Sequence, residues 1–405
     1  MKSNYRRIGD SIRLVDERNV GLKVKTLLGL SISKEFISSV ANIIGSDMEN
    51  YKIIKKNQFA CSTMQVRRDK KMPVALLQEV DEAIVSQAYP VFEVTDSNEL
   101  MPEYLMMWFS RQEFDREACF YAIGGVRGSL EWEDFCDMKL PIPKPAKQKE
   151  TVKEYNVLVD RIIFNNQLIE ELEKTAQAIY KQWFVDFEFP DLNGKPYKSS
   201  GKKMRFNAEL EKEVPEGWEV KPFTKIVKLG GGGTPDTNEE NYWNGNIPFF
   251  TPADVSNSYY SVITEKYITE AGLKSSSTKV YPKNTVFVTA RGTVGAMSIA
   301  GCKMAMNQSC YAITGRKEMN QYFVHQLSIE AISKLKNEAV GAVFGALVTK
   351  DFDSQLAIEP EEEVIARYGG TVKSIYEKIL NIENQNQQLA IMRNLILEKM
   401  ASTKN

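Results

Sequence analysis

A long internal repeat is the feature that most constrains what this chain can fold into. The segment GGVRGSLEWEDFCDMKLPIP (residues 124–143) has its counterpart in GAVFGALVTKDFDSQLAIEP (residues 341–360), at a constant offset of 217. The matched identities include Gly124 with Gly341, Gly128 with Gly345, Leu130 with Leu347, Phe135 with Phe352 and Pro143 with Pro360. A repeat of this length predicts two similar halves rather than one undivided domain.

A heptad-like segment follows each copy of the repeat. Thr151-Val152-Lys153 recurs as Thr371-Val372-Lys373, and apolar residues then follow at spacings of three and four. The first set is Val152, Tyr155, Val159, Ile162, Asn166, Ile169, Leu172, Ala176 and Ile179, and the second is Val372, Ile375, Ile379, Ile382, Asn386, Leu389, Met392 and Ile396. The steps are the same in both sets and include one stammer. We therefore predict two matched amphipathic helices, the first of about 33 residues and roughly 50 Å.

Asn166 and Asn386 hold the same core-type position in these helices. A polar residue at such a position costs stability but fixes the register and the choice of partner. Equivalent positions of an antiparallel pair meet only at its pseudo-twofold axis. We therefore expect an antiparallel coiled coil in which Asn166 faces Asn386 and the two set the register. For either stripe alone, packing against its own domain is the plainer alternative.

About 150 mixed residues precede each helix. Tyr51–Cys61 and Thr278–Thr289 are expected to form strands around a Lys-Asn turn, and Pro102–Phe109 and Gln321–Leu327 to form short helices. The predicted fold class is α+β, with two globular domains separated by two long antiparallel helices. The expected boundaries are 1–146 and 213–360 for the domains, 147–190 and 361–405 for the helices, and 191–212 for a linker rich in Pro, Gly, Ser and Lys.

Composition excludes several classes of protein. No apolar run approaches eighteen residues, so we expect no membrane segment and a cytoplasmic location. Five cysteines without a CxxC pair argue against a disulfide framework and a zinc ribbon, and no metal site is expected. The single histidine, His325, lies in an apolar stretch and is expected to pack in the core.

Signatures of catalysis are missing from the sequence. Gly230–Gly233 lead into Thr-Pro-Asp-Thr, so they form neither a phosphate loop nor a dinucleotide fingerprint, and a tight or mobile loop is expected there. HExxH, GxSxG and an Asn-Pro-Pro-aromatic tetrapeptide are absent. We therefore predict no catalytic residue and no cofactor, with a free-standing nuclease or methyltransferase as a minor alternative.

Several longer motifs resemble a known family. In the second half these are PEGWEVKPF (215–223), GGGGTPDTNEENYWNGNIPFFTPADV (230–255) and PKNTVFVTARGTVGAMSI (282–299); in the first half they are YRRIGD (5–10), YKIIKKNQFAC (51–61) and AIYKQWFVDFEFP (178–190). With these motifs in this order, the chain resembles the specificity subunits of type I restriction-modification enzymes over essentially its full length. The resemblance implies two target-recognition domains that bind double-stranded DNA. It also implies two methyltransferase subunits that bring S-adenosylmethionine, and restriction subunits that hydrolyse ATP.

The resemblance also implies a form of DNA site. Two domains of different sequence would read two different half-sites, and the helices would set the gap between them. At 3.4 Å per base pair, a separation of about 35 to 50 Å corresponds to roughly 10 to 15 base pairs. We therefore expect a bipartite, asymmetric site.

Candidate DNA contacts follow from residue type and setting. They are Arg67, Arg68, Lys70 and Lys71 in a basic run, Arg127 between glycines, Arg291 in TARGTVG, and the pair Tyr259 and Tyr260. Arg is the commonest reader of guanine, and glycine lets the backbone approach phosphates. Surface ion pairs are the plainer alternative for the cations, and core packing for the tyrosines. The net charge of −1 leaves a coiled-coil protein-interaction adaptor that does not read DNA as the main alternative function.

Overall fold

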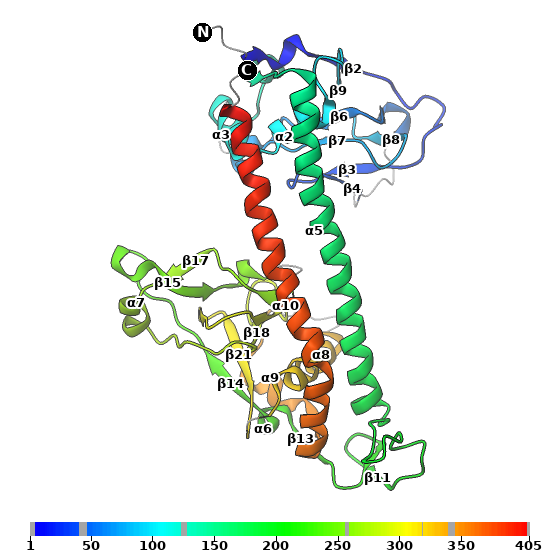
Figure 1. Ribbon diagram of the computed structural model, residues 1–405, viewed down its shortest axis with the longest axis vertical. Helices are drawn as coiled ribbons and strands as arrows, with labels where there is room; N and C mark the ends of the chain where they lie inside the picture. Colours follow the sequence, from blue (N-terminus) through cyan, green and yellow to red (C-terminus); the bar gives the residue numbers. More distant parts are fainter. Residues whose placement is uncertain are drawn as a thin grey trace. The chain divides into compact units, whose positions relative to one another are not determined.

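The chain folds into two compact units, each containing an α+β domain. The computed structural model describes residues 5–39, 47–122, 128–255, 259–317, 319–338 and 345–402. Unit 1 comprises residues 1–162 and 388–405, and unit 2 comprises residues 163–387 (Figure 1). Each unit therefore includes part of both long helices, whereas the boundaries expected from the sequence set the helices apart as segments of their own. The predicted fold class is confirmed.

Unit 1 is built on a four-stranded sheet with the order β2-β9-β6-β7. Its strands are β1 (Tyr5–Arg7), β2 (Ile12–Val15), β3 (Leu28–Leu30), β4 (Phe36–Ser38), β5 (Lys52–Lys55), β6 (Gln58–Cys61), β7 (Val74–Leu76), β8 (Glu82–Val85), β9 (Val91–Val94) and β10 (Lys139–Pro141). Its short helices are α1 (Val66–Asp69), α2 (Pro102–Phe109), α3 (Gln112–Tyr121) and α4 (Trp132–Asp137). Stacked rings of Phe59 and Phe92, with centroids 5.0 Å apart, lie in the core between sheet and helices.

Unit 2 is built on a five-stranded sheet with the order β14-β21-β18-β19-β16. Its strands are β11 (Met204–Asn207), β12 (Lys212–Pro215), β13 (Glu219–Pro222), β14 (Val227–Gly231), β15 (Trp243–Phe250), β16 (Tyr260–Ser261), β17 (Lys266–Ile268), β18 (Val286–Thr289), β19 (Met297–Ala300), β20 (Ala305–Met306), β21 (Cys310–Gly315) and β22 (Leu356–Glu359). Its helices, besides the long pair, are α6 (Phe223–Ile226), α7 (Glu270–Ser275), α8 (Gln321–Glu338) and α9 (Thr349–Ser354). All four residues of β18 are buried, as expected of a β-branched and aromatic run at the centre of a sheet.

The two sheets share one strand order. β2, β9, β6 and β7 of unit 1 correspond in sequence and in pairing to β14, β21, β18 and β19 of unit 2. The equivalence continues through α4 and β10 of unit 1, which correspond to α9 and β22 of unit 2 at the offset of 217. The repeat in the sequence is therefore a repeat of the fold.

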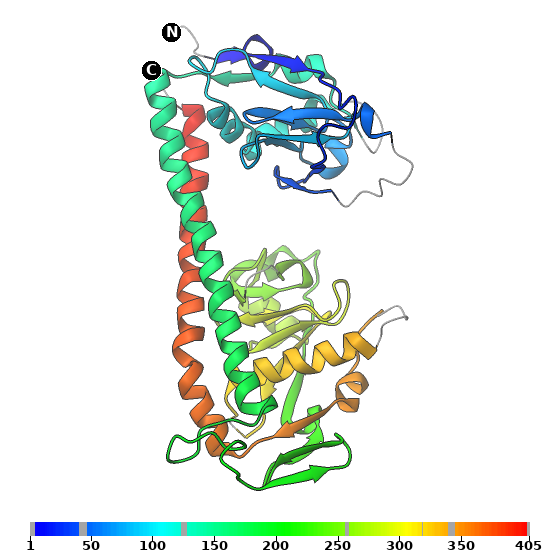
Figure 2. The same ribbon diagram turned by 90° about the vertical axis from the view of Figure 1, so that its right-hand side faces the viewer.

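The two long helices are α5 (Pro145–Tyr180) and α10 (Glu362–Lys399), and a short π-helix (Lys181–Val185) continues α5. Within each unit they run side by side in opposite directions (Figure 2). In unit 2, the Tyr180 ring of α5 lies 6.2 Å from the Tyr368 ring near the start of α10, whereas Asn165 reaches Asn386 further along. The predicted antiparallel pairing is confirmed.

Strands β5 and β6 flank the Lys56-Asn57 turn as expected, and β5 pairs with β8. Two other local expectations need correction. The segment beginning at Gln321 is an 18-residue helix rather than a short one. The expected linker contains β11 and the first residue of β12, and Tyr197 stacks on Phe189 with ring centroids 4.6 Å apart, so this segment packs within unit 2.

The glycine run also differs from the expected loop. Gly230 and Gly231 end strand β14 rather than forming a loop. A Cβ at Gly232 would lie 2.2 Å from the Asn307 carbonyl oxygen, and one at Gly233 would lie 2.2 Å from the Ser277 hydroxyl. A side chain at either position would clash, so the glycines allow a close backbone approach.

Among the described helices, none is long and apolar enough to cross a membrane.

Candidate nucleic-acid interface

The basic run of unit 1 forms an exposed loop between two buried anchors. The β6–β7 loop (residues 62–73) contains the one-turn helix α1, which begins after Gln65 and ends before Lys70, both in the left-handed backbone region with φ of 66° and 52°. Val66 and Met72 are fully buried and fasten the loop to the domain. Arg67, Arg68, Lys70 and Lys71 are all exposed. The apolar anchors thus hold four cations at the surface, as a phosphate-contacting loop requires.

Helix α3 supports this loop from beneath. The Asp115 carboxylate accepts a hydrogen bond from the Met72 backbone N–H at 3.1 Å and forms an ion pair with Lys34 at 2.8 Å. The Cys119 thiol donates to the Val66 carbonyl at 3.4 Å. Burial lowers the pKa of Lys34, and the Asp115 charge opposes that shift. Asp115 therefore ties the β3–β4 hairpin, which carries Lys34, to the backbone of the basic loop.

The cations of the β6–β7 loop differ in how far they are neutralised. Arg68 pairs with Asp69 at 2.6 Å, and this hydrogen bond lowers the pKa of Asp69. Within the described residues, Arg67, Lys70 and Lys71 make no ion pair. Among the residues that the structure describes, these three side chains therefore have no acidic partner.

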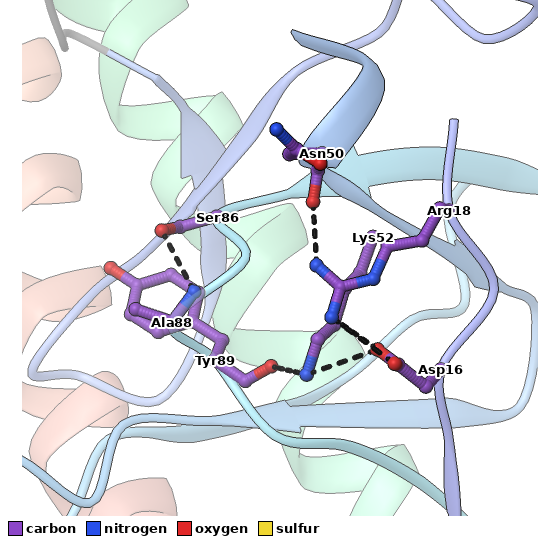
Figure 3. A network of polar contacts seen from close by, with 7 residues as sticks. All are labelled: Asp16, Arg18, Asn50, Lys52, Ser86, Ala88 and Tyr89. Atoms are coloured by element: carbon purple, nitrogen blue, oxygen red, sulfur yellow. Dashed lines mark hydrogen bonds and ion pairs between the residues drawn. The ribbon is translucent and has the colours of Figure 1, made fainter. Parts of the chain in front are cut away.

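Other cations of unit 1 are neutralised internally. Figure 3 shows Asp16 between two of them, with Arg18 at 2.9 Å and Lys52 at 3.6 Å. Arg18 also donates to the Asn50 carbonyl at 2.7 Å and Lys52 to the Tyr89 carbonyl at 3.0 Å. The Arg18 hydrogen bond is the main cause that lowers the pKa of Asp16. This network joins strand edges, which distinguishes it from the basic loop.

Unit 2 carries the corresponding loop with fewer cations. The β18–β19 loop (residues 290–296) is closed by Thr289, whose hydroxyl accepts a hydrogen bond from the Ala296 N–H at 3.0 Å. Gly292 and Gly295 have φ of 80° and 73°, the left-handed region that glycine occupies without strain. Arg291 is exposed at the tip. The structure therefore presents this predicted contact residue on a tight turn.

Both loops make the same contact with the repeated motif. In unit 1 the Leu130 N–H donates to the Thr63 carbonyl at 2.9 Å, and in unit 2 the Leu347 N–H donates to the Ala290 carbonyl at 2.9 Å. Leu130 and Leu347 are equivalent residues of the repeat. Each cationic loop is thus fixed beside the segment that follows the glycine-rich motif. Arg127 of that motif lies outside the described residues.

The two predicted tyrosine contacts differ in their burial. Tyr260 is 2% exposed and its hydroxyl donates to the Asn284 side-chain oxygen at 3.0 Å. The Tyr259 ring lies 4.8 Å from the His325 ring, and its hydroxyl accepts from Gln326 at 3.1 Å. Both belong to the interior polar and aromatic packing of unit 2, because their apolar rings fill space between α8 and the sheet. Burial of Tyr260 contradicts its predicted DNA contact, whereas Tyr259 is half-buried and its contact stays a prediction.

His325 is part of the same interior. It is 4% exposed, and its Nδ1 lies 3.0 Å from the Tyr376 hydroxyl. Burial lowers the pKa of His325 to about 3, so the imidazole is uncharged at neutral pH. Within the described residues, no cluster of three or more His, Cys, Asp or Glu side chains is arranged to hold a metal ion.

Asn166 and Asn386 of the helix pair are in contact as expected, but the buried asparagine of α5 is not the one that the sequence pattern predicted. Asn386 donates to the Asn166 side-chain oxygen at 2.9 Å, and Asn165 donates to the Asn386 side-chain oxygen at 2.7 Å. Asn165 also donates to Gln385 at 2.9 Å, so two pairs of equivalent residues meet at one place. However, Asn165 is 1% exposed whereas Asn166 is exposed, so the core position belongs to Asn165. The sequence pattern placed the core asparagine of α5 one residue too late.

The stripe on α10 is corrected in the same way. Met392 is 52% exposed, although the heptad pattern placed it in the core. Nearby, Leu397 is buried and packs in the core of unit 1 with Val152 of α5. Sequence analysis did not identify three residues with a structural role, because each acts through a partner that is distant in sequence. They are Asn165 and Gln385 in the helix pair and Asp115 beneath the basic loop.

Comparisons with known proteins agree with this architecture. A model of the type I restriction modification DNA specificity domain matches residues 41–174 and 215–390. The type I restriction enzyme MjaIX specificity subunit of Methanocaldococcus jannaschii is 24% identical over 305 residues, which cover 74% of this chain and 68% of that protein. The HindI specificity subunit of Haemophilus influenzae is 24% identical over 416 residues, covering 90% of this chain and 89% of that protein.

A solved structure shares the fold. The S subunit of a type I restriction-modification system from M. genitalium superposes with a TM-score of 0.55 at 14% sequence identity, covering 99% of this chain and 96% of that chain. The two segments that match the domain model each contain one of the two cationic loops.

Proposed function

Because the chain belongs to the type I restriction-modification specificity subunits, the non-catalytic DNA-recognition subunits of their complexes, we propose that each unit reads one half of a bipartite, asymmetric DNA site. The observation that carries the proposal is the duplicated loop contact. The carbonyls of Thr63 and Ala290, each just after an equivalent strand, accept a hydrogen bond from the equivalent residues Leu130 and Leu347, which fixes each cationic loop beside the repeated motif. The two loops differ in sequence, so the two half-sites differ as well.

The contacts divide by chemistry. Arg67, Lys70 and Lys71 are assigned to phosphates, because exposed cations with no ion pair among the described residues are free to bind phosphate oxygens and release counterions. Arg291, on a turn with two positive-φ glycines, is assigned to a base edge, where an arginine can donate to guanine O6 and N7 together.

The helix pair is assigned the role of a spacer. α5 has 36 residues, which correspond to about 54 Å at 1.5 Å per residue. A rigid element of this length supports a gap on the scale of roughly 10 to 15 base pairs between half-site centres. The Asn165, Asn166 and Asn386 contacts support a fixed register of the pair.

The same helices are assigned to docking of two methyltransferase subunits, through which restriction subunits would join the complex. In unit 1, Val157 of α5 is 59% exposed, and Ile391 and Leu395 of α10 are 53% and 48% exposed. In unit 2, Ile163 and Phe164 of α5 are 51% and 57% exposed. Exposed apolar residues of this number support burial against a partner protein.

A helix insertion tests the spacer role. Four residues, about one turn, are inserted into α5 at the exposed position after Arg161, and methylated adenines are mapped across the genome. We expect both half-sites to be unchanged and the gap to lengthen by about one or two base pairs, since one turn adds roughly 6 Å. The control inserts four residues after Gly201, outside both helices. An unchanged gap would contradict the spacer role.

DNA binding separates this function from that of a protein-interaction adaptor. The chain assembled with its methyltransferase subunits should bind the methylated sequence more tightly than a scrambled duplex, with an affinity that falls steeply with salt. If both duplexes bind equally and the affinity does not depend on salt, the result would favour a protein-interaction adaptor that does not read DNA.

A further inference from the structure

An exposed aromatic pair ends helix α3 of unit 1. Phe120 is 79% exposed and Tyr121 is 40% exposed, and their rings meet edge to face with centroids 5.4 Å apart. The opposite face of the same helix is buried through Phe114 and Ala118. α3 is therefore amphipathic up to its last turn, where two adjacent aromatic residues cannot both point inward.

The pair lies beside the cationic β6–β7 loop. Cys119, the residue before Phe120, donates its thiol hydrogen to the Val66 carbonyl within the loop at 3.4 Å. Burial raises the pKa of the Cys119 thiol, and the charges of Arg67 and Lys70 oppose that shift. Both cations are thus close to the end of α3. Arg116, one turn before Phe120 on the same face, is also exposed.

The fold itself does not require an aromatic side chain at this position. By the offset of 217, Asn337 and Glu338 of α8 correspond to Phe120 and Tyr121. Both are exposed, and α8 is complete to Glu338 with these polar residues at its end. A large ring exposed to water contributes little to folding, so the fold of α3 does not depend on Phe120.

We propose that Phe120 is an aromatic wedge that contacts the base stack of duplex DNA beside the half-site read by unit 1. The inference rests on the proposed function and adds a specificity-determining residue to it. Apolar and aromatic side chains that enter a groove between base steps are flanked by cations that hold the adjacent phosphates. The four cations of the β6–β7 loop supply that flank, and Tyr121 supports the ring from one side.

Charge complementarity selects DNA over a protein as the occupant. A protein-docking patch is usually a broad apolar centre with few charges, whereas Phe120 and Tyr121 form a two-residue aromatic pair beside cations. Arg67, Lys70 and Lys71 make no ion pair within the described residues, which suits a strongly anionic partner.

The test compares single variants of the full chain in its complex with methyltransferase subunits. The probe is a duplex carrying the sequence that adenine-methylation mapping returns, with a scrambled duplex for comparison. Phe120→Ala should weaken binding of the specific duplex by about tenfold, whereas Phe120→Trp should stay within about threefold of the natural chain. Phe206→Ala is the matched control, because Phe206 of β11 is also an exposed phenylalanine, at 65%, outside both loops.

Salt dependence distinguishes the wedge from the cations around it. Phe120→Ala should leave the slope of log affinity against log salt unchanged, whereas Arg67→Ala with Lys70→Ala should reduce it by about two. 2-Aminopurine placed next to the half-site, away from the methylated adenine, should brighten on binding of the natural chain but not of Phe120→Ala.

Three outcomes would overturn the proposal in different ways. If Phe120→Ala binds as tightly as Phe206→Ala while the double cation variant loses affinity, the wedge is wrong and the proposed function stands. If the cation variant also binds normally, the DNA-reading role of this loop is wrong. If Phe120→Ala keeps its fold but no longer assembles with the methyltransferase subunits, the ring contacts protein.

Discussion

The β6–β7 loop of unit 1 and the β18–β19 loop of unit 2 leave equivalent strands and make the same backbone contact, yet they differ in chemistry. The first carries four cations between the buried anchors Val66 and Met72. The second carries Arg291 alone, on a turn shaped by two positive-φ glycines. The comparison shows that a sheet and its hydrogen bonds can repeat while the loops diverge. Divergent loops on a repeated framework are what an asymmetric site requires.

The two loops also differ in what holds them. In unit 1 a buried carboxylate, Asp115, reaches the loop backbone from α3 and is neutralised by Lys34. In unit 2 the Thr289 hydroxyl closes the loop at its own base. The longer loop needs a side chain from outside itself, because its ends alone leave the middle of the loop without support.

Removing Asp115 should produce the largest effect on stability. Asp115→Ala leaves Lys34 buried without its charge partner, and we expect the free energy of unfolding of unit 1 to fall by about 3 to 5 kcal/mol in urea titrations. The control is Glu150→Ala on α5 of unit 1, whose exposed pair with Lys147 is worth roughly 0 to 1 kcal/mol. Equal effects of the two substitutions would show that the buried pair does not hold the loop.

Substitution of the cations in the two loops should change the salt dependence of DNA binding to different extents. Replacing Arg67, Arg68, Lys70 and Lys71 with Ala should weaken DNA binding by about 100-fold, or roughly 2.7 kcal/mol, and flatten the salt slope by about three or four. Arg291→Ala should cost about tenfold with little change of slope, because a base contact is replaced rather than several phosphate contacts. Equal slopes for the two variants would contradict the division of roles.

Sequence alone predicted the repeat, the helix pair and the exposed cations, because each depends on local spacing or residue type. The buried Tyr260 was ambiguous, since a tyrosine after a polar segment can pack inward or outward. Asp115 and Phe120 were beyond reach, because their roles depend on which segments fold against α3. Asn165 was missed by a single residue, since an apolar pattern with a stammer leaves two registers open.

The contact between equivalent asparagines in the helix pair should contribute to stability, and removing one of these side chains should show by how much. Asn386→Leu removes a hydrogen-bond partner from the buried Asn165 and should lower the free energy of unfolding by about 1 to 3 kcal/mol. Asn384→Leu on the exposed face is the control. If both variants unfold alike, the asparagine contact does not stabilise the pair.

A carboxyl pair limited to unit 2 gives the smallest effect. Burial, and then Glu383 on α10, raise the pKa of Glu173 to about 7 from an ordinary value of 4.5. Between these pH values the folded chain holds a proton that the unfolded chain has lost, so stability falls as pH rises and levels off above pH 7. Glu173→Gln should raise the melting temperature by about 2 °C at pH 8 and leave it unchanged at pH 4. The same gain at both pH values would mean that the carboxyl does not titrate in this range.

The central claim is that each unit reads its own half-site, and mapping methylated adenines in cells that carry loop variants tests it most directly. With Arg291→Ala, the bases of one half should become ambiguous while the other half and the gap stay unchanged. With Arg67→Ala and Lys70→Ala together, methylation of the whole site should fall without blurring the bases recognised in either half, because these cations are assigned to phosphates. Blurring of both halves by Arg291→Ala, or of neither half, would contradict the claim.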